Sequence, residues 1–133
     1  MVFSTTTLLL LKTFVTGVAG LSMTPKMSVA VFGATGLTGR EVTHQLLERG
    51  VPVRALCRDP SRVLTPLGSC GEEGADKPVE NELLYKLKGD VTKAEDVEKV
   101  FETGDVSGVV VALGGKTKDV GKTMLTDGTA AII

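Results

Sequence analysis

Residues 28–39 read SVAVFGATGLTG, and this stretch decides the fold. It opens within a short, valine-rich apolar run, residues 27–32, which is typical of a buried strand. Glycines then recur at a spacing of three, as Gly33, Gly36 and Gly39, before apolar residues repeat at helical intervals. The pattern predicts a strand, a tight turn and a helix that packs back on the strand.

The glycines have separate physical roles in such a unit, which is typical of a Rossmann-type fold. Gly33 lets the chain leave the strand sharply, Gly36 lets a phosphate approach the backbone, and Gly39 lets the helix pack closely. Unpaired amides at the helix N-terminus face the anion, and Thr35 and Thr38 add hydroxyl groups beside it. We therefore expect this turn to hold the pyrophosphate of a dinucleotide.

Glycine spacing alone is a weak signal, because the same spacing recurs at Gly68, Gly71 and Gly74. This second copy follows no expected strand and leads into a proline, which breaks helices. We interpret residues 58–78 as a loop with at most a short helix at residues 61–67. The flanking strand and helix, and not the spacing, carry the prediction for the first copy.

Expected strands and helices alternate along the rest of the chain. The strands are residues 27–32, 52–57, 82–88 and 106–113, and the helices are residues 37–49, 94–102 and 119–133. Gly50 is expected to end the first helix, and Thr92 with Glu95 forms a capping box for the second. This order predicts an α/β fold, a doubly wound parallel sheet of about four strands in one domain, residues 27–133. The third strand is more polar, so we place it nearer an edge.

Composition excludes several classes of function. Hydrophobic residues make up 42% and charged residues 23% of the chain, and the net charge is −1 with both signs interspersed. Aromatic residues are only 4%, and no basic stripe is present, so we expect no nucleic-acid partner. Cys57 and Cys70 fit no metal-binding spacing, and we expect no metal site. The single histidine, His44, lies in the body of the first helix and is expected to be solvated or packed.

Residues 1–26 differ from the rest, since they are rich in serine and threonine and contain no acidic residue. The first carboxylate of the chain is that of Glu41. Their leucine run ends at Lys12, far short of the roughly 20 apolar residues that span a membrane. We expect an organellar transit peptide, in a plastid or mitochondrion. A secretory signal, or a plain tail on a cytoplasmic protein that starts at Met23 or Met27, are the alternatives.

The end of the second strand predicts the type of dinucleotide. An acidic residue there accepts the ribose hydroxyls of NAD, whereas arginine pairs with the 2′-phosphate of NADP. The sequence places Arg58 directly after the strand and Arg62 four residues later. We therefore expect NADP(H) to be preferred, while Asp59 leaves NAD(H) as an alternative.

Further motifs follow in order: LCRDPSRV at 56–63, KGDV at 88–91, VVVALGG at 109–115 and TDG at 126–128. Together with the glycine turn they carry a resemblance that runs from about residue 29 to residue 133. On these motifs the sequence resembles the atypical short-chain dehydrogenase/reductases, most closely the biliverdin reductase B (flavin reductase) group, with NmrA-like proteins as relatives.

The resemblance implies a cofactor site that can be carried over by position. The pyrophosphate loop would be Gly33, Thr35, Gly36, Leu37, Thr38 and Gly39, and the 2′-phosphate would lie against Arg58 and Arg62. Asp90 and Val91 would border the adenine. Leu113, Gly114 and Gly115 would pass under the ribose and nicotinamide, with Lys116 one residue away from a basic position of the family.

The chain departs from the family in two respects. The Tyr-x-x-x-Lys pair of short-chain dehydrogenases is absent, because the only tyrosine is Tyr85 and position 89 is Gly89. No catalytic residue is therefore assigned. The family domain also continues beyond the fourth strand, which here would be a sheet edge with apolar valines. We expect either a truncated product or a fragment that needs a partner chain.

Three functions follow from these observations. The first is an NADPH-dependent reductase that delivers hydride to a flavin, a tetrapyrrole or a similar acceptor. The second is a non-catalytic NAD(P)-binding or redox-sensing module. The third is a P-loop nucleotidase at residues 115–123, which is disfavoured because five residues separate its glycines where the motif needs four.

Overall fold

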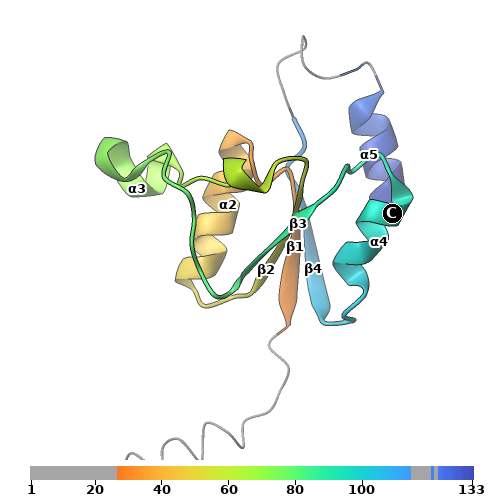
Figure 1. Cartoon of the computed structure of the whole chain (residues 1–133), viewed down its shortest axis with the longest axis horizontal. Helices are drawn as coiled ribbons and strands as arrows, with labels where there is room; N and C mark the ends of the chain where they lie inside the picture. The colour runs from red at the N-terminus through yellow and green to blue at the C-terminus, as the bar shows by residue number, and fades with distance from the viewer. Residues whose placement is uncertain (1–26, 115–120, 122) are drawn as a thin grey trace, which may run out of the picture.

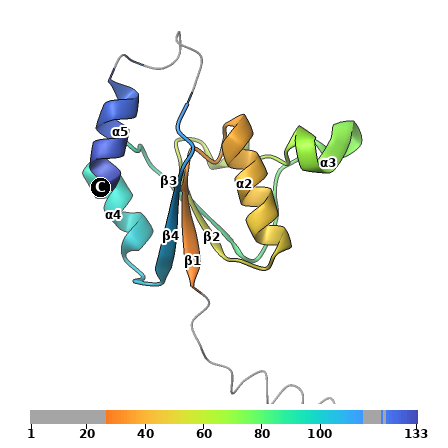
Figure 2. The same cartoon turned by 180° about the vertical axis from the view of Figure 1, so that it is seen from behind.

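The computed structural model describes residues 27–114, 121 and 123–133, which form a parallel sheet with helices on both faces (Figures 1 and 2). The strands are β1 (Ser28–Phe32), β2 (Val53–Cys57), β3 (Leu84–Lys88) and β4 (Val106–Val111). The helices are α2 (Leu37–Glu48), η1 (Pro60–Arg62), α3 (Leu67–Gly74), α4 (Ala94–Phe101) and α5 (Met124–Ile132). The strand order is β3-β2-β1-β4, and every neighbouring pair is parallel.

The two faces of the sheet build two apolar clusters, because side chains alternate along each strand. Val31 of β1 packs in the cluster beneath α2, whereas Ala30 and Phe32 pack in the cluster beneath α4 and α5. Figure 2 shows α2 on one face, with α3 outside it, and α4 and α5 on the other. Phe32 is fully buried, a burial that contributes roughly 1.5–3 kcal/mol.

The predicted fold class is confirmed, and each expected strand lies within two residues of the observed one. Gly50 follows the last helical turn with a φ of +70°, and its amide donates to the carbonyl of Leu47 at 2.9 Å. The more polar third strand, β3, lies at one edge, and β4 lies at the other.

The prediction for residues 58–78 is wrong. Helix η1 ends at Arg62, and α3 contains the second set of glycines, with a kink at Gly71 where φ is +69°. Local propensity disfavours a helix with these glycines. Contacts with α2 stabilise it instead, since the Ser69 amide and hydroxyl both donate to the carboxylate of Glu41.

The predicted capping box is also wrong. Helix α4 begins at Ala94, and no side chain caps it at the preceding Lys93. The Thr92 hydroxyl donates to the carboxylate of Asp90 at 2.8 Å, and the Asp90 amide donates to Asp96 at 2.9 Å. The Thr92 hydroxyl is thus bonded to Asp90 and does not cap the helix, because such local side-chain bonds compete with capping.

Several predictions fall on residues 1–26, 115–120 and 122, which lie outside the described residues. They are the leader segment, the roles of Gly115 and Lys116, the P-loop alternative and the first turn of the last expected helix. Within residues 27–114 and 123–133, no helix is long and apolar enough to cross a membrane.

Candidate functional site

The predicted site residues that the structure describes gather at one edge of the sheet. The strands are parallel, so their carboxyl ends meet at the same edge, the upper one in Figure 1. The glycine turn follows β1, Arg58 follows β2, Asp90 lies two residues after β3, and Leu113 lies two residues after β4. β1 and β4 are neighbours although the chain visits β2 and β3 between them, and ligands of doubly wound folds bind at such a switch point.

The glycine turn is fixed by close backbone packing. Gly33 has a φ of +93°, and a Cβ there would overlap the carbonyl group of Ala112 after β4. A Cβ at Gly39 would overlap the carbonyl group of Gly33. At Gly36 the nearest atom to an added Cβ lies 3.5 Å away, an ordinary contact. The protein's own packing therefore requires glycine at positions 33 and 39 but not at 36.

Among the described residues, no side chain caps the N-terminus of α2. Gly36 occupies the N-cap position, and the first turn of the helix has no acidic residue. Leu37 is 84% exposed, and Thr38 is also exposed. The first amides of a helix have no intrahelical acceptor, and the helix dipole is positive at this end. This end of α2 can therefore accept an anion.

Arg58 and Arg62 lie exposed on the connection after β2. Between them, the carboxylate of Asp59 accepts hydrogen bonds from the Ser61 amide at 3.0 Å and the Ser61 hydroxyl at 2.6 Å. These bonds, the hydroxyl one foremost, lower the pKa of Asp59, with a smaller contribution from Arg62. Within the described part of the chain, neither arginine forms an ion pair with a carboxylate.

The segments that follow the two edge strands, β3 and β4, both reach α5. Gly128 of α5 lies so close that an added Cβ would be 3.1 Å from both Val91 and Leu113. Leu113 also borders the glycine turn, since its amide would be 3.1 Å from a Cβ at Gly33. Gly114 is exposed beyond it. The hydrogen bonds from Thr92 lower the pKa of Asp90, and the charge of Arg58 adds a smaller effect.

Tyr85 and His44 lie away from this edge. The Tyr85 ring is near the start of β3, with the Arg54 guanidinium 5.9 Å from its centre. His44 lies on α2 with its Nε2 3.6 Å from the sulfur of Cys70. Cys57, by contrast, is the last residue of β2 and is buried next to Arg58. Among the described residues, no cluster of His, Cys, Asp and Glu could hold a metal ion.

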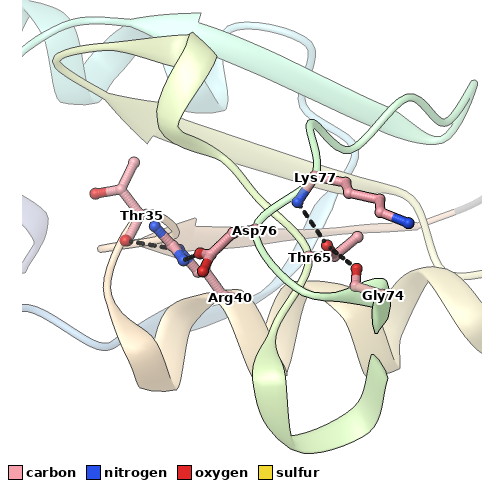
Figure 3. Close-up of polar contacts among 6 residues, drawn as sticks. All are labelled: Thr35, Arg40, Thr65, Gly74, Asp76 and Lys77. Carbon is pink, nitrogen blue, oxygen red and sulfur yellow. Dashed lines mark hydrogen bonds and ion pairs between the residues drawn. The ribbon is translucent and has the colours of Figure 1, made fainter. Parts of the chain in front are cut away.

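Sequence reasoning missed Arg40 and Asp76. The Nε of Arg40 donates to the carbonyl of Thr35 in the glycine turn at 3.1 Å, and its Nη1 lies 2.7 Å from Oδ1 of Asp76 (Figure 3). Asp76 lies beyond α3 in the chain, and no motif links the two positions. The only signal in the sequence is the position of Arg40 itself. It places a cation near the N-terminus of a helix that is expected to hold an anion.

A parallel α/β sheet with a glycine turn at its switch point defines a dinucleotide-binding Rossmann domain. The family model described as NAD(P)H-binding matches residues 33–133, and the chain belongs to this family.

Solved structures share the fold at low sequence identity. The Bordetella bronchiseptica enzyme WbmH in complex with NAD+ has a TM-score of 0.60 at 16% identity, over 81% of this chain and 34% of that one. Yeast methylglyoxal/isovaleraldehyde reductase Gre2 complexed with NADPH has a TM-score of 0.58 at 19% identity, over 80% and 31%. Epimerase Mth375 from Methanothermobacter thermautotrophicus has a TM-score of 0.57 at 22% identity, over 80% and 30%. The chain thus spans about a third of the length of these proteins.

Proposed function

We propose that this chain binds NADP(H) in preference to NAD(H) and takes part in an NADPH-dependent reduction. The observation that carries the preference is the pair of exposed guanidinium groups, Arg58 and Arg62, on either side of a carboxylate that is already hydrogen-bonded. The two cofactors differ only at the adenosine ribose, where NADP carries a 2′-phosphate and NAD a hydroxyl group.

The state of Asp59 favours the phosphate. A carboxylate that selects NAD has to accept a hydrogen bond from the ribose hydroxyl. Oδ1 of Asp59 already accepts two bonds from Ser61, which hold the carboxylate against helix η1. Arginine pairs with phosphate through parallel, charge-assisted hydrogen bonds. Among the described residues, the connection after β2 therefore offers two arginines outside any ion pair, beside a carboxylate whose Oδ1 is already engaged.

The remaining predicted residues fit the rest of a dinucleotide. The uncapped N-terminus of α2 would hold the pyrophosphate, with Gly36 leaving the outer side of the turn open. Asp90 and Val91 would border the adenine. Leu113 and Gly114 would lie under the ribose and nicotinamide.

The reduction itself would use hydride that the bound nicotinamide supplies. The residues of this chain would bind and orient the dinucleotide and exclude water from it. The resemblance to the biliverdin reductase B group indicates a flat, conjugated acceptor such as a flavin or a tetrapyrrole. A non-catalytic NAD(P)-binding or redox-sensing module is the second candidate.

Binding is tested by titrating NADPH and NADH separately and following the fluorescence of the nicotinamide. Arg58→Ala and Arg62→Ala should each weaken NADPH binding about tenfold, while NADH affinity stays unchanged. Arg49→Ala is the matched control, because Arg49 is an exposed arginine at the opposite end of α2. Equal affinity of the wild-type chain for the two cofactors would contradict the preference.

Turnover separates the reductase from the sensing module. NADPH oxidation is followed by its absorbance with a flavin, a quinone or a tetrapyrrole as acceptor. Consumption that requires the protein and falls with Gly36→Ala, which should leave the fold intact, supports a reductase. Tight NADPH binding without consumption supports the sensing module.

A further inference from the structure

Arg40 and Asp76 connect the glycine turn to a distant part of the chain. Arg40 is on α2, and Asp76 is on the connection between β2 and β3, residues 58–83. The Arg40 side chain is only 14% exposed, whereas that of Asp76 is 75% exposed. Figure 3 shows the guanidinium of Arg40 between the Thr35 carbonyl and the Asp76 carboxylate.

The position of Arg40 calls for an explanation. A cation near the N-terminus of a helix opposes the helix dipole, and nearly burying it adds a desolvation cost. Nothing in the packing of α2 requires a guanidinium there, because the buried residues of this helix are Gly39, Thr43 and Leu47. The bond to Thr35 and the carboxylate of Asp76 are what offset these costs.

Asp76 is held in place independently of Arg40. It is the only described non-glycine residue with positive φ, at +55°, a conformation that asparagine and aspartate tolerate better than most residues. Its amide donates to the Thr65 carbonyl at 3.0 Å. The Thr65 hydroxyl donates to the Gly74 carbonyl and accepts from the Lys77 amide, so the chain is fastened on both sides of Asp76 (Figure 3).

The bond to Thr35 fixes one peptide unit of the glycine turn at both ends. The carbonyl of Thr35 accepts from Arg40 at 3.1 Å, and the amide of the same peptide unit, on Gly36, donates to Gly33 at 3.0 Å. The next amides along the chain, on Leu37 and Thr38, are the first of α2. The orientation of this peptide unit therefore sets the direction of the amides that face the anion.

We propose that Arg40 and Asp76 are a positioning pair that preorganises the glycine turn for the cofactor, so that the connection between β2 and β3 controls cofactor affinity. The proposal rests on the proposed cofactor site. Neither residue needs to touch the cofactor, because a turn that is already ordered loses less entropy on binding.

The test compares variants of the full chain by NADPH titration. Arg40→Gln should weaken binding about tenfold and Asp76→Asn about threefold, and the double variant should be no weaker than Arg40→Gln because both act through one contact. Asp76→Asn keeps a residue that tolerates positive φ, and it leaves the Arg40 bond to Thr35 possible. The controls are Arg49→Gln, which removes a positive charge just after α2, and Glu73→Gln, which removes a negative charge from α3.

Two further measurements separate positioning from other roles. Arg40→Lys keeps the charge but cannot hold both partners with one planar fork, so it should bind as weakly as Arg40→Gln. Wild-type affinity in Arg40→Lys would overturn the proposal and leave a purely electrostatic effect. In the cofactor-free protein, Asp76→Asn should shift the backbone amide resonances of Gly36 and Leu37 while the urea midpoint stays within error.

The outcomes also distinguish this proposal from the proposed function. A wild-type chain that binds neither NADPH nor NADH refutes the function. A wild-type chain that binds, with Arg40→Gln and Asp76→Asn binding equally well, refutes only the positioning pair. If Arg40→Gln does not fold, the affinity and amide shifts of Asp76→Asn decide the question.

Discussion

The Nε of Arg54, in the middle of the sheet, donates a 2.7 Å hydrogen bond to the carbonyl of Val100 near the end of α4. A second bond of 3.4 Å runs from Nη2 to the carbonyl of Lys99. Arg54 is only 9% exposed, and the last carbonyls of a helix have no intrahelical donors. The guanidinium also suits the negative end of the helix dipole. A strand residue thus holds a helix on the face that carries α5.

Arg54→Met should therefore destabilise the protein by about 2–3 kcal/mol, because buried carbonyls lose a charged donor. Urea unfolding followed by circular dichroism measures the change. Arg49→Met is the control, since Arg49 is exposed and its side chain makes no such bond in the described structure. A change in the free energy of unfolding below about 0.5 kcal/mol would show that solvent replaces the bond.

The hydroxyl of Thr43 has no hydrogen-bond partner among the described residues, although this side chain is 1% exposed. Thr43→Val replaces the hydroxyl by a methyl group of similar size, so it should stabilise the fold by about 1 kcal/mol. The urea midpoint measures the gain, and Thr129→Val on the exposed side of α5 is the control. A destabilised Thr43→Val protein would indicate that the hydroxyl has a partner after all.

Gly36 and Gly39 should respond differently to substitution by alanine. Gly39→Ala forces an overlap with the Gly33 carbonyl, and it should cost several kcal/mol of stability and abolish binding. Gly36→Ala meets only an ordinary contact at 3.5 Å, so the free energy of unfolding should stay nearly unchanged. Its methyl group would occupy the space proposed for the pyrophosphate, and NADPH affinity should fall at least tenfold. Unchanged affinity in Gly36→Ala would place the phosphates elsewhere.

Stability should fall in acid partly because of Asp96. Its pKa lies below the ordinary value of 3.8, chiefly because the Lys99 side chain donates to it and also because the Asp90 amide does. A lowered folded-state pKa gives stability that is complete above about pH 5 and is lost as the pH falls through that pKa. Asp96→Asn should lower the urea midpoint at pH 7, and the difference from wild type should shrink toward pH 3.

The control for this pH profile is Glu98→Gln, which removes one carboxylate from the exposed side of the same helix. Within the described structure Glu98 forms no ion pair. A difference between Asp96→Asn and wild type that stays constant from pH 7 to pH 3 would contradict the role of the ionised carboxylate.

The edge strand β4 should promote self-association. Val109 and Val111 are each 45% exposed on this strand, and an apolar edge with open backbone groups pairs readily with other strands. Size-exclusion chromatography should show concentration-dependent association of the chain. Val109→Lys should reduce it, because lysine protects sheet edges, whereas Tyr85→Lys on the opposite edge strand should not. A wild-type monomer at all concentrations would refute this expectation.

Local patterns in the sequence were sufficient for the four strands, for helices α2, α4 and α5, and for the edge of the sheet at which the candidate site lies. The valine-rich runs and the glycine turn are signals of neighbouring residues, and connection rules turn their order into a parallel sheet. Arg58, Asp90 and Leu113 come soon after strands, so the sheet itself brings them to one edge. Their positions were predictable because each residue lies a fixed, short distance in sequence after the end of a strand.

Tertiary structure alone decided the features that join distant residues without a periodic pattern. Helix α3 forms despite its glycines because Glu41, 28 residues away, binds Ser69. Arg40 meets Asp76 across 36 positions, and no spacing rule predicts that contact. The sequence by itself determined a dinucleotide-binding unit, since strand, turn and helix periods are local. Which side chains hold its glycine turn in place depended on packing in three dimensions.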